Sequence, residues 1–383
     1  MPIDPTGSID VIVAGLGAHG SSAAYRLAAR GASVLGFDRF ARGHTLGSSG
    51  GLSRIIRLSY YEHPDYVPLL RRAWTLWRDL ERDSGETLLT ETGGLYAGDP
   101  NGELVAGALE SARRHRLDHE VLDAATLRER YPLFDWLDGW QGVFERQAGW
   151  LAPERCIETH LRLAEESGAT LRFDEPVEHW ESTRDGVRVT TSTGTFDAKQ
   201  LVIAAGAWES QLAPSLAPEL SVERNVLLWF EPTAERDAFA RLPIYIVDDT
   251  DRIFYGFPYI DGQGVKVAGL HFGDKADPDT VDRIASPSDE ERVRAWLRRR
   301  MPLANGERRD AKVCMYTNTS DANFVIDRLP DDPNVVVASA CSGHGFKFST
   351  VIGEILADLV LDGETRHPIR FLSADRLASK IGG

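Results

Sequence analysis

Positive charge and cysteine are both scarce in this sequence. Its 383 residues include 43 Lys plus Arg against 58 Asp plus Glu, which gives a formal net charge of -15. A protein of this sign is a poor electrostatic match to a nucleic acid or an anionic membrane, so neither partner is expected. The three cysteines, Cys156, Cys314 and Cys341, are too few and too scattered for a disulfide framework or a zinc site, and no metal is expected.

Long apolar runs are missing as well. The first residues, MPIDPTGSIDVIVAGLG, lack the basic region and the long apolar stretch of a secretory signal, and no segment approaches the ~18 apolar residues of a membrane span. We therefore expect a cytoplasmic protein. With 42% hydrophobic and 26% charged residues, a chain of this length can form two domains with large cores.

A glycine motif near the start predicts a dinucleotide site. Residues 10–15 (DVIVAG) are typical of a strand buried on both faces, and Gly15, Gly17 and Gly20 then match the pattern G-x-G-x-x-G. Gly15 allows the tight turn and Gly17 lets the backbone approach a pyrophosphate, while Gly20 lets helix and strand pack closely. After a helical stretch and a second strand, Asp38 is placed to bind the ribose hydroxyls. The motif alone does not distinguish FAD from NAD.

The middle of the chain has a different pattern. The segment TETGGLYAG (90–98) reads as a pair of strands, and alternating, aromatic-rich strands between 225 and 317 indicate an antiparallel sheet. The nucleotide-binding pattern then resumes. The sequence predicts an α/β fold in which a Rossmann-like nucleotide-binding domain (1–88, 148–222 and 318–383) is interleaved with a mostly antiparallel-sheet substrate domain (89–147 and 223–317).

Reactive residue types gather where the nucleotide-binding pattern resumes. In VVVASACSGHGFKFSTVIGEILADLV (335–360), a buried strand meets a helix across a turn that holds two glycines, a histidine and a lysine. Gly343 and Gly345 free backbone N–H groups at a helix N-terminus, a site suited to a negative charge that develops on a ligand. His344 suits a structural role, in which a neutral imidazole caps a backbone group.

A second candidate segment, GHTLGSSGGLSRIIRLSYY (43–61), is a glycine- and serine-rich loop that leads into two arginines. Arg54 and Arg57 lie three residues apart, and so on neighbouring parts of one face if the segment is helical. Their planar guanidinium groups suit a carboxylate, with surface salt bridges as the alternative. Lys266, in GQGVKVAG, lies on an apolar strand, where a lysine is costly unless its charge is used.

Five motifs occur in order along the whole chain: DVIVAGLGAHG, SRIIR, FYGFP, KVCMYT and CSGHGFKFSTVIGEILADL. Together they closely resemble those of the monomeric sarcosine oxidase and N-methyltryptophan oxidase family, flavoenzymes of the D-amino acid oxidase-like fold. The resemblance implies an FAD-binding domain and a monomeric oxidase that acts on sarcosine and other N-methyl (secondary) amino acids with oxygen as the acceptor. The implied products are the amino acid, formaldehyde and hydrogen peroxide.

The resemblance also implies which residues surround the cofactor. Cys314, in the CMYT motif, matches the family cysteine that forms a thioether to the flavin, and only a thiolate is nucleophilic enough for that bond. A packed free thiol is the alternative, and we take Cys341 as a small buried residue. Arg54, counted with the catalytic set, matches an arginine that modulates the flavin electrostatically. The residues implied to bind FAD are Gly15, Gly17, Gly20, Asp38, Cys314, Gly343, His344, Gly345, Phe346 and Lys347.

The other catalytic residues implied by the resemblance face the substrate and oxygen. Arg57 and Lys347 match the pair that binds the substrate carboxylate and thereby orients the amine. Tyr255 and Tyr316 match tyrosines that line the pocket, with core aromatics as the alternative. Lys266 matches a lysine near the reactive edge of the flavin, where a cation stabilises superoxide and promotes oxygen reduction.

Two departures from the family pattern concern the substrate. Sarcosine-specific relatives have a histidine four residues after the lysine of the GVK segment. Here that position is Leu270, with His271 one step along and expected on the opposite side of a strand. Two adjacent loop histidines of such relatives correspond to Ser49 and Gly50. These changes indicate a pocket for bulkier, more hydrophobic or cyclic N-methyl amino acids.

Two other enzyme classes share the fold. A deaminating glycine or D-amino acid oxidase acts on primary amines and usually holds FAD without a covalent bond, and the CMYT cysteine argues against it. A flavin dehydrogenase uses an acceptor other than oxygen, and Lys266 argues against that class. A non-catalytic nucleotide-binding protein would have no use for the reactive turn at 341–347.

Overall fold

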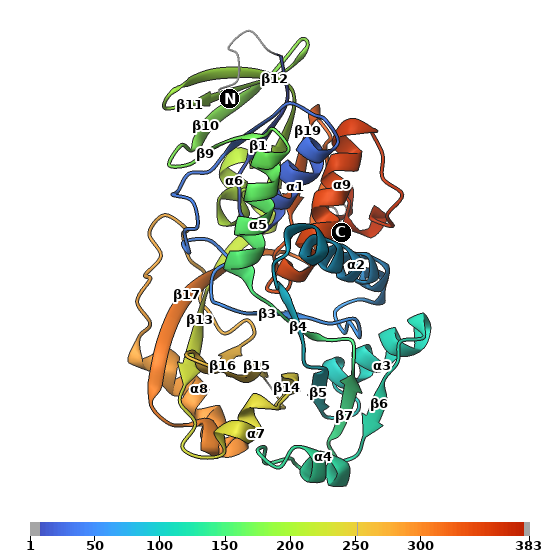
Figure 1. The fold of residues 1–383 in the computed structure, drawn as a ribbon, viewed down its shortest axis with the longest axis vertical. Coiled ribbons are helices and arrows are strands. Elements are labelled where there is room, and N and C mark those ends of the chain that lie inside the picture. The colour runs from blue at the N-terminus through green and yellow to red at the C-terminus, as the bar shows by residue number, and fades with distance from the viewer. Residues whose placement is uncertain (1–7, 251, 379–383) are drawn as a thin grey trace.

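The computed structural model describes residues 8–250 and 252–378, and its two large sheets lie in different halves of the molecule (Figure 1). The first sheet has a parallel centre in the order β9, β2, β1, β12 and β19, and β10, β11 and β18 extend it with antiparallel pairs. Its strands are β1 (Ile9–Ala14), β2 (Val34–Phe37), β9 (Thr170–Arg172), β10 (Val177–Thr183), β11 (Gly186–Thr191), β12 (Gly194–Ile203), β18 (Val325–Leu329) and β19 (Asp332–Ser339).

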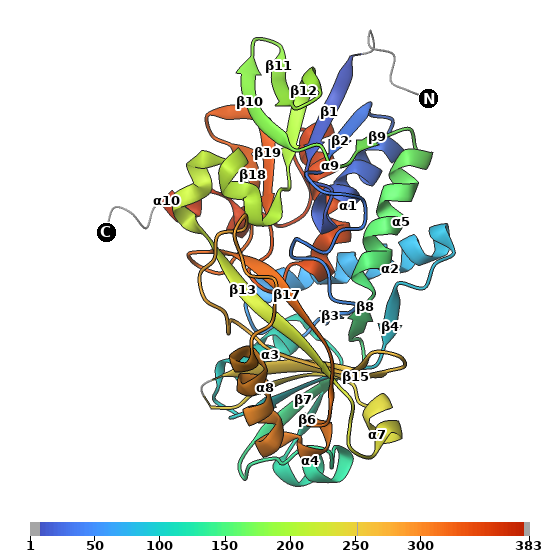
Figure 2. The ribbon, with the colours of Figure 1, turned by 90° about the vertical axis from the view of Figure 1, so that its left-hand side faces the viewer.

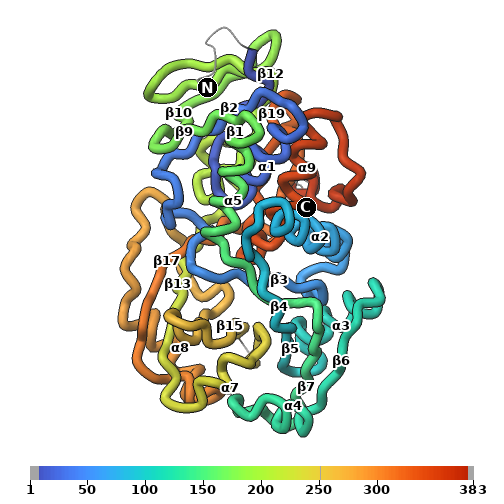
Figure 3. The backbone as a smooth tube through the Cα atoms, in the orientation of Figure 1, coloured from blue at the N-terminus to red at the C-terminus, as the bar shows by residue number. Residues whose placement is uncertain are grey.

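Helices α1 (Ala18–Ala29), α5 (Pro153–Glu166) and α9 (Ser349–Leu361) belong to this half. Glycines allow their close packing. A Cβ atom on Gly20 would lie 1.8 Å from the carbonyl oxygen of Gly15, and one on Gly353 would lie 2.2 Å from Ser22 Oγ. The start of α1 is therefore held directly against the end of β1. Helices α1 and α9, which come from opposite ends of the sequence, lie side by side here, as the tube in Figure 3 shows.

The second sheet occupies the other half and is antiparallel except for the pair β14 and β5. Side chains of α4 (Ala124–Arg130), α7 (Arg236–Ala240) and α8 (Pro287–Arg300) pack against one of its faces, and the other face is turned toward the first half (Figure 2). In sheet order the strands are β17 (Arg308–Thr319), β13 (Leu220–Phe230), β16 (Gly264–Gly269), β15 (Ile253–Ile260), β14 (Ile244–Asp248), β5 (Gly94–Gly98), β7 (Gln141–Glu145) and β6 (Glu120–Leu122).

A small third sheet bears on two sequence predictions. It consists of β3 (Arg54–Ile56), β8 (Gly149–Leu151) and β4 (Leu89–Glu91). The condition that Arg54 and Arg57 share a helical face is not met, because the β-branched residues between them favour a strand and pair with β8. The two strands predicted over 90–98 are present, but they do not pair with each other: β4 pairs with β8, while β5 pairs with β7 and β14.

The remaining helices connect these layers. They are α2 (Val67–Ser84), α3 (Glu103–His115), α6 (Glu209–Leu212), α10 (Asp375–Ala378) and short 3-10 turns at Pro64–Tyr66, Gly206–Trp208, Pro214–Glu219, Pro302–Ala304, Phe346–Phe348 and Arg370–Leu372.

Between residues 8 and 250, and from 252 to 378, no helix has the length and apolar content needed to cross a membrane.

Candidate active site

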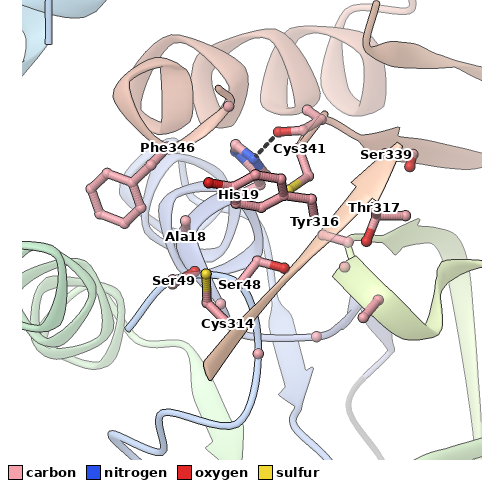
Figure 4. Close-up of a pocket in the computed structure, with 18 of the residues that line it drawn as sticks. Ala18, His19, Ser48, Ser49, Cys314, Tyr316, Thr317, Ser339, Cys341 and Phe346 are labelled. Atoms are coloured by element: carbon pink, nitrogen blue, oxygen red, sulfur yellow. Dashed lines mark hydrogen bonds between the residues drawn. The ribbon is translucent and has the colours of Figure 1, made fainter. Parts of the chain in front are cut away.

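A cavity of about 500 Å³ lies between the two large sheets. Its lining includes the turn between β1 and α1, the 47–62 segment, strands of the second sheet, and the turn before α9. Figure 4 shows Ser48, Ser49, Cys314 and Tyr316 among the side chains that surround it. The predicted site residues that line it are Gly15, Gly17, Asp38, Arg54, Arg57, Tyr255, Cys314, Tyr316, Gly343, His344, Gly345, Phe346 and Lys347, whereas Gly20 and Lys266 lie behind its wall.

One end of the cavity has the features of a dinucleotide cradle. Gly15 has a φ of 93°, and a Cβ there would lie 2.5 Å from the carbonyl oxygen of Ala204. At Gly17 the nearest atom to an added Cβ is Ser49 Oγ, at 3.9 Å, so nothing in the protein fills this space. An open space beside a helix N-terminus fits a pyrophosphate, because the first N–H groups of α1 and the helix dipole both favour an anion.

Asp38 closes the same end. Its Oδ2 accepts a hydrogen bond from Leu16 N at 2.8 Å, and its Oδ1 accepts one from Phe40 N at 3.0 Å. These bonds fix the carboxylate at the cavity lining, and each oxygen keeps a lone pair for a further donor. The geometry therefore allows the predicted ribose contact.

Both Cys314 and Cys341 line the cavity, so position alone does not choose between them. The Cys314 side chain is almost fully buried. Burial raises the pKa of its thiol, while the nearby Arg54 and Lys266 pull that pKa down. Cations near the sulfur favour the reactive thiolate.

Lys266 lies behind the wall, with 1% of its surface exposed. Its Nζ donates hydrogen bonds to the carbonyl oxygens of Gly51 (2.8 Å) and Ser53 (2.7 Å), and Ser53 Oγ lies 3.3 Å away. Burial and then Arg54 lower its pKa well below the usual value, but three oxygen acceptors match the three N–H groups of an ammonium ion. Leu52, between the two carbonyl groups, has a φ of 66°.

The other end of the cavity holds two buried cations. The Arg57 guanidinium carbon lies 4.3 Å from the centre of the Tyr60 ring, and Lys347 Nζ lies 5.1 Å from it. Arg57 pairs with Glu62 at 2.6 Å, and Lys347 Nζ donates to the carbonyl oxygen of His344 at 2.6 Å. Burial and the positive charge of Arg57 lower the pKa of Lys347 to about 7. Two cations and one nearby carboxylate give this end of the cavity a net positive charge, which suits a ligand that carries a negative charge.

The residues around these cations have defined polar partners. His344 Nδ1 lies 2.5 Å from Tyr60 OH, and its Nε2 lies 3.1 Å from the carbonyl oxygen of Ala322. Burial lowers the pKa of His344 to about 4, so a neutral imidazole fits both contacts. The hydroxyl groups of Tyr255 and Tyr316 lie 3.2 Å apart, and burial raises the pKa of Tyr255 to about 12.

Three residues at the site were not predicted from sequence. Glu62 pairs with Arg57, and His19 lines the cavity with its Nε2 2.8 Å from the carbonyl oxygen of Ala340. Glu145 accepts hydrogen bonds from Leu58 N, Ser59 N and the hydroxyl groups of Ser59 and Tyr96. Of these three residues, only Glu145 could have been noticed in the sequence, because it is a charged residue at the end of an apolar stretch that is typical of a strand.

No three His, Cys, Asp or Glu side chains of the described residues are grouped so that they could hold a metal ion. Positively charged and neutral groups dominate the cavity lining. The site therefore suits an organic dinucleotide and a small carboxylate.

Comparison with known proteins agrees with this geometry. A family model described as FAD dependent oxidoreductase matches residues 10–359. The monomeric sarcosine oxidase of Streptomyces avermitilis is 45% identical over 97% of this chain and 98% of its own length. The N-methyl-L-tryptophan oxidase of Yersinia pestis is 35% identical over 91% of this chain and 94% of its own length. The relatives confirm the family resemblance found in the motifs, and the family model indicates that the cofactor is FAD and not NAD.

Solved structures share the same fold. NikD, described as an unusual amino acid oxidase essential for nikkomycin biosynthesis, has a TM-score of 0.83 at 26% identity, covering 96% of this chain and 98% of its own. The L-proline dehydrogenase of P. horikoshii has a TM-score of 0.84 at 20% identity, and the match covers 97% of this chain and 98% of the dehydrogenase chain. The predicted α/β fold with a Rossmann-like FAD-binding domain is thus confirmed.

Proposed function

The chain belongs to the FAD dependent oxidoreductase family, and within it we propose an oxidase that demethylates sarcosine and other N-methyl amino acids. One observation carries this proposal: a single cavity joins the open space at Gly17 to the buried cations Arg57 and Lys347. The first feature fits the cofactor phosphates and the second fits a substrate carboxylate. The reaction converts an N-methyl amino acid, oxygen and water into the amino acid, formaldehyde and hydrogen peroxide.

FAD bound in the cavity would supply the two-electron acceptor that no side chain provides. The turn at Gly17 and the Asp38 carboxylate would hold its phosphate and ribose groups. Arg57 and Lys347 bind the substrate carboxylate, which fixes the direction of the N-methyl group. The substrate loses two electrons with one C–H and one N–H hydrogen, water hydrolyses the resulting imine, and oxygen takes up both electrons and both protons as hydrogen peroxide.

We also propose that the flavin is attached through Cys314. Arg54 and Lys266 offset part of the cost that burial places on the Cys314 thiolate, and the position of Cys314 in the CMYT motif supports this cysteine over Cys341. The Cys314 sulfur would form the S–C bond with loss of the thiol hydrogen and one hydrogen of a ring methyl group, and oxygen would take up the two electrons and two protons as hydrogen peroxide. Acid-precipitated protein is expected to stay yellow, Cys314→Ser should release its flavin, and Cys341→Ser should retain it. Release from the Cys341 variant alone would contradict the assignment.

Lys266 is our proposed site for the reduction of oxygen. Its ammonium group is buried against the 51–53 carbonyl groups, beside Arg54, and a fixed cation in a low-dielectric site stabilises superoxide more strongly than one in water. We further propose a cytoplasmic monomer whose domains follow the two large sheets, with boundaries near 88, 147, 222 and 317. Sedimentation equilibrium should give a single species near the chain mass of 42.3 kDa.

The test of the main proposal is peroxide release in air. Purified holoenzyme is given sarcosine, N-methyl-L-tryptophan, L-proline, glycine and D-alanine in parallel. Peroxide and formaldehyde from N-methyl substrates, with none from glycine or D-alanine, are expected. Peroxide from the primary amines alone would indicate a deaminating oxidase, and reduction of an artificial dye without peroxide would indicate a dehydrogenase.

A further inference from the structure

We propose that the cavity selects N-methyl amino acids with an apolar side chain, such as N-methylleucine, over sarcosine. This inference rests on the proposed N-methyl amino acid oxidase function and names its substrate class. It concerns a set of five cavity-lining side chains, called the apolar wall, which comes from β3, β14, β15 and the residue after β16. The apolar wall consists of Ile55, Ile246, Ile253, Phe257 and Leu270.

The apolar wall is one continuous surface. Ile246 and Phe257 belong to a single hydrophobic cluster, and Ile55, Ile253 and Leu270 pack against that cluster. Residues two apart on a strand point to the same face, which places Ile253 and Phe257 on one side of β15. A ligand in the cavity therefore meets an unbroken aliphatic and aromatic surface.

The apolar wall begins beside the carboxylate-binding cations. In the sheet register, Ile246 pairs with Tyr96 on one side and with Tyr255 on the other. The guanidinium carbon of Arg57 lies 5.7 Å from the centre of the Tyr96 ring. Neighbouring strands are about 4.8 Å apart, so Ile246 lies one strand away from the ring that Arg57 covers. The side chain of an amino acid held by its carboxylate lies within reach of this surface.

The far end of the apolar wall is Leu270, near the turn before α9. Its Cδ1 lies 3.3 Å from the position that a Cβ on Gly343 would take, and Tyr316 lies 3.1 Å from that same position. The strand ends at Gly269, and the neighbouring His271 has a φ of 53° and pairs with Glu223 at 3.0 Å. His271 is outside the cavity lining, as the sequence indicated, so no imidazole faces the substrate from this segment.

None of the five side chains of the apolar wall carries a polar group. The hydroxyl groups nearest to it, those of Tyr255 and Tyr316, are within hydrogen-bond distance of each other. A polar substrate side chain would lose its water and find no partner on this surface. Each buried methylene, in contrast, improves transition-state binding by about fourfold. The physical balance favours an aliphatic side chain over a hydrogen atom.

The test compares kcat/KM, measured by peroxide release from holoenzyme, for sarcosine, N-methylalanine, N-methylleucine and N-methylserine. We expect kcat/KM to rise about fourfold with each buried carbon, so that N-methylleucine, with four more carbons than sarcosine, exceeds it by up to about 250-fold if the whole side chain is buried and by at least about tenfold if only half of it is. N-methylserine should be used less well than N-methylalanine. Leu270→His places a polar imidazole on the apolar wall and should reduce the leucine-to-sarcosine ratio by about tenfold.

Two matched variants on β14 separate specificity from stability. Ile246→Val removes one methylene from the apolar wall and should lower the leucine-to-sarcosine ratio about fourfold. Ile244→Val removes the same group from a residue that is buried on the same face but outside the cavity, and should leave the ratio unchanged. The flavin absorbance spectrum of each variant shows whether its cofactor site is intact.

The outcomes distinguish the two proposals. If sarcosine is oxidised as well as N-methylleucine, and Leu270→His leaves the ratio unchanged, the apolar wall does not select the substrate, although the oxidase proposal stands. If the variants alter only the flavin spectrum, the apolar wall serves the cofactor and the inference is overturned. If no N-methyl amino acid is oxidised at all, the proposed function itself fails.

Discussion

Glu145 offers the sharpest test of how the protein positions Arg57, the arginine proposed to bind the substrate. Both carboxylate oxygens are fully used: one accepts from Leu58 N and Tyr96 OH, and the other from Ser59 N and Ser59 Oγ. The bonds to backbone N–H measure 2.9 and 2.8 Å. The segment that they fix follows Arg57 directly, and the carbonyl oxygen of Ser59 accepts a hydrogen bond from Arg57 at 3.0 Å. Glu145 therefore holds the backbone that holds the arginine.

Glu145→Gln keeps the shape of the side chain but turns one oxygen into an N–H donor. The hydroxyl groups of Ser59 and Tyr96 can rotate, but at least one backbone N–H is left facing another donor. An unpaired buried donor costs about 1–3 kcal/mol, which a shift of the segment would relieve at the expense of the Arg57 position. We expect the KM for sarcosine to rise about tenfold, equivalent to ~1.4 kcal/mol, with kcat changed by less than about threefold.

Glu81→Gln is the matched control. Glu81 Oε1 also accepts from two backbone N–H groups, those of Leu88 (2.7 Å) and Leu89 (2.9 Å), in a segment that does not line the cavity. Steady-state peroxide kinetics and thermal unfolding are measured for both variants. Both should lower the melting temperature, but only Glu145→Gln should raise KM. Equal KM values in the two variants would refute the idea that Glu145 positions Arg57.

Three further predictions concern the cofactor, oxygen and pH. In Gly17→Ala the added Cβ meets no protein atom closer than 3.9 Å, so the apoprotein should unfold at nearly the wild-type temperature. FAD binding, measured by fluorescence titration, should weaken more than about tenfold, because the methyl group occupies the space of the phosphates. Unchanged FAD binding would show that the phosphates lie elsewhere. Lys266→Met should slow reoxidation by oxygen far more than anaerobic reduction by substrate in stopped-flow absorbance, and equal slowing of both would remove Lys266 from the oxygen step. The pKa of Lys347 is about 7 in the free site, and a lysine is mainly charged below its pKa. The affinity of the site for 3-methylbutanoate, a carboxylate without an amine, should therefore be greatest below pH 7. Above pH 7 this affinity should fall by up to about tenfold per pH unit. Lys347→Gln should flatten that profile in calorimetric titrations, and a wild-type profile that is flat from pH 6 to 9 would contradict the assignment.

The parts of the site that were predictable are those encoded over short stretches. The spacing of Gly15, Gly17 and Gly20 predicted the cradle, because a turn, a helix start and a close strand contact are local requirements. The shared helical face considered for Arg54 and Arg57 does not form, because the isoleucines between them favour a strand. The spacing of residues along the chain predicts which side chains share a face only when the segment has been assigned correctly to a helix or a strand.

The contacts that hold Lys266 and those that fix the segments around Arg57 and Lys347 were not predictable, because they join distant parts of the chain. Lys266 was correctly placed on a buried strand, but the carbonyl groups that it binds lie 215 and 213 residues earlier. The bond between Glu145 and Ser59 spans 86 residues, and that between Tyr60 and His344 spans 284. Such pairs depend on the relative placement of two sheets, for which a single sequence carries no periodic signal.

The division of labour in the cavity follows from this architecture. The cofactor cradle and the two cations proposed to bind the carboxylate lie outside the strands of the two large sheets: Leu16 N is bonded to Asp38 of another segment, and Arg57 and Lys347 are bonded to carbonyl oxygens two or three residues away. The surface proposed to select the side chain lies mainly on β14 and β15, where the sheet register fixes Ile246 between Tyr96 and Tyr255. A strand position is set by ladder hydrogen bonds on both sides, so a substitution at Ile246 changes shape without moving the backbone. Substrate preference can therefore diverge among proteins of this fold while the cofactor chemistry stays unchanged.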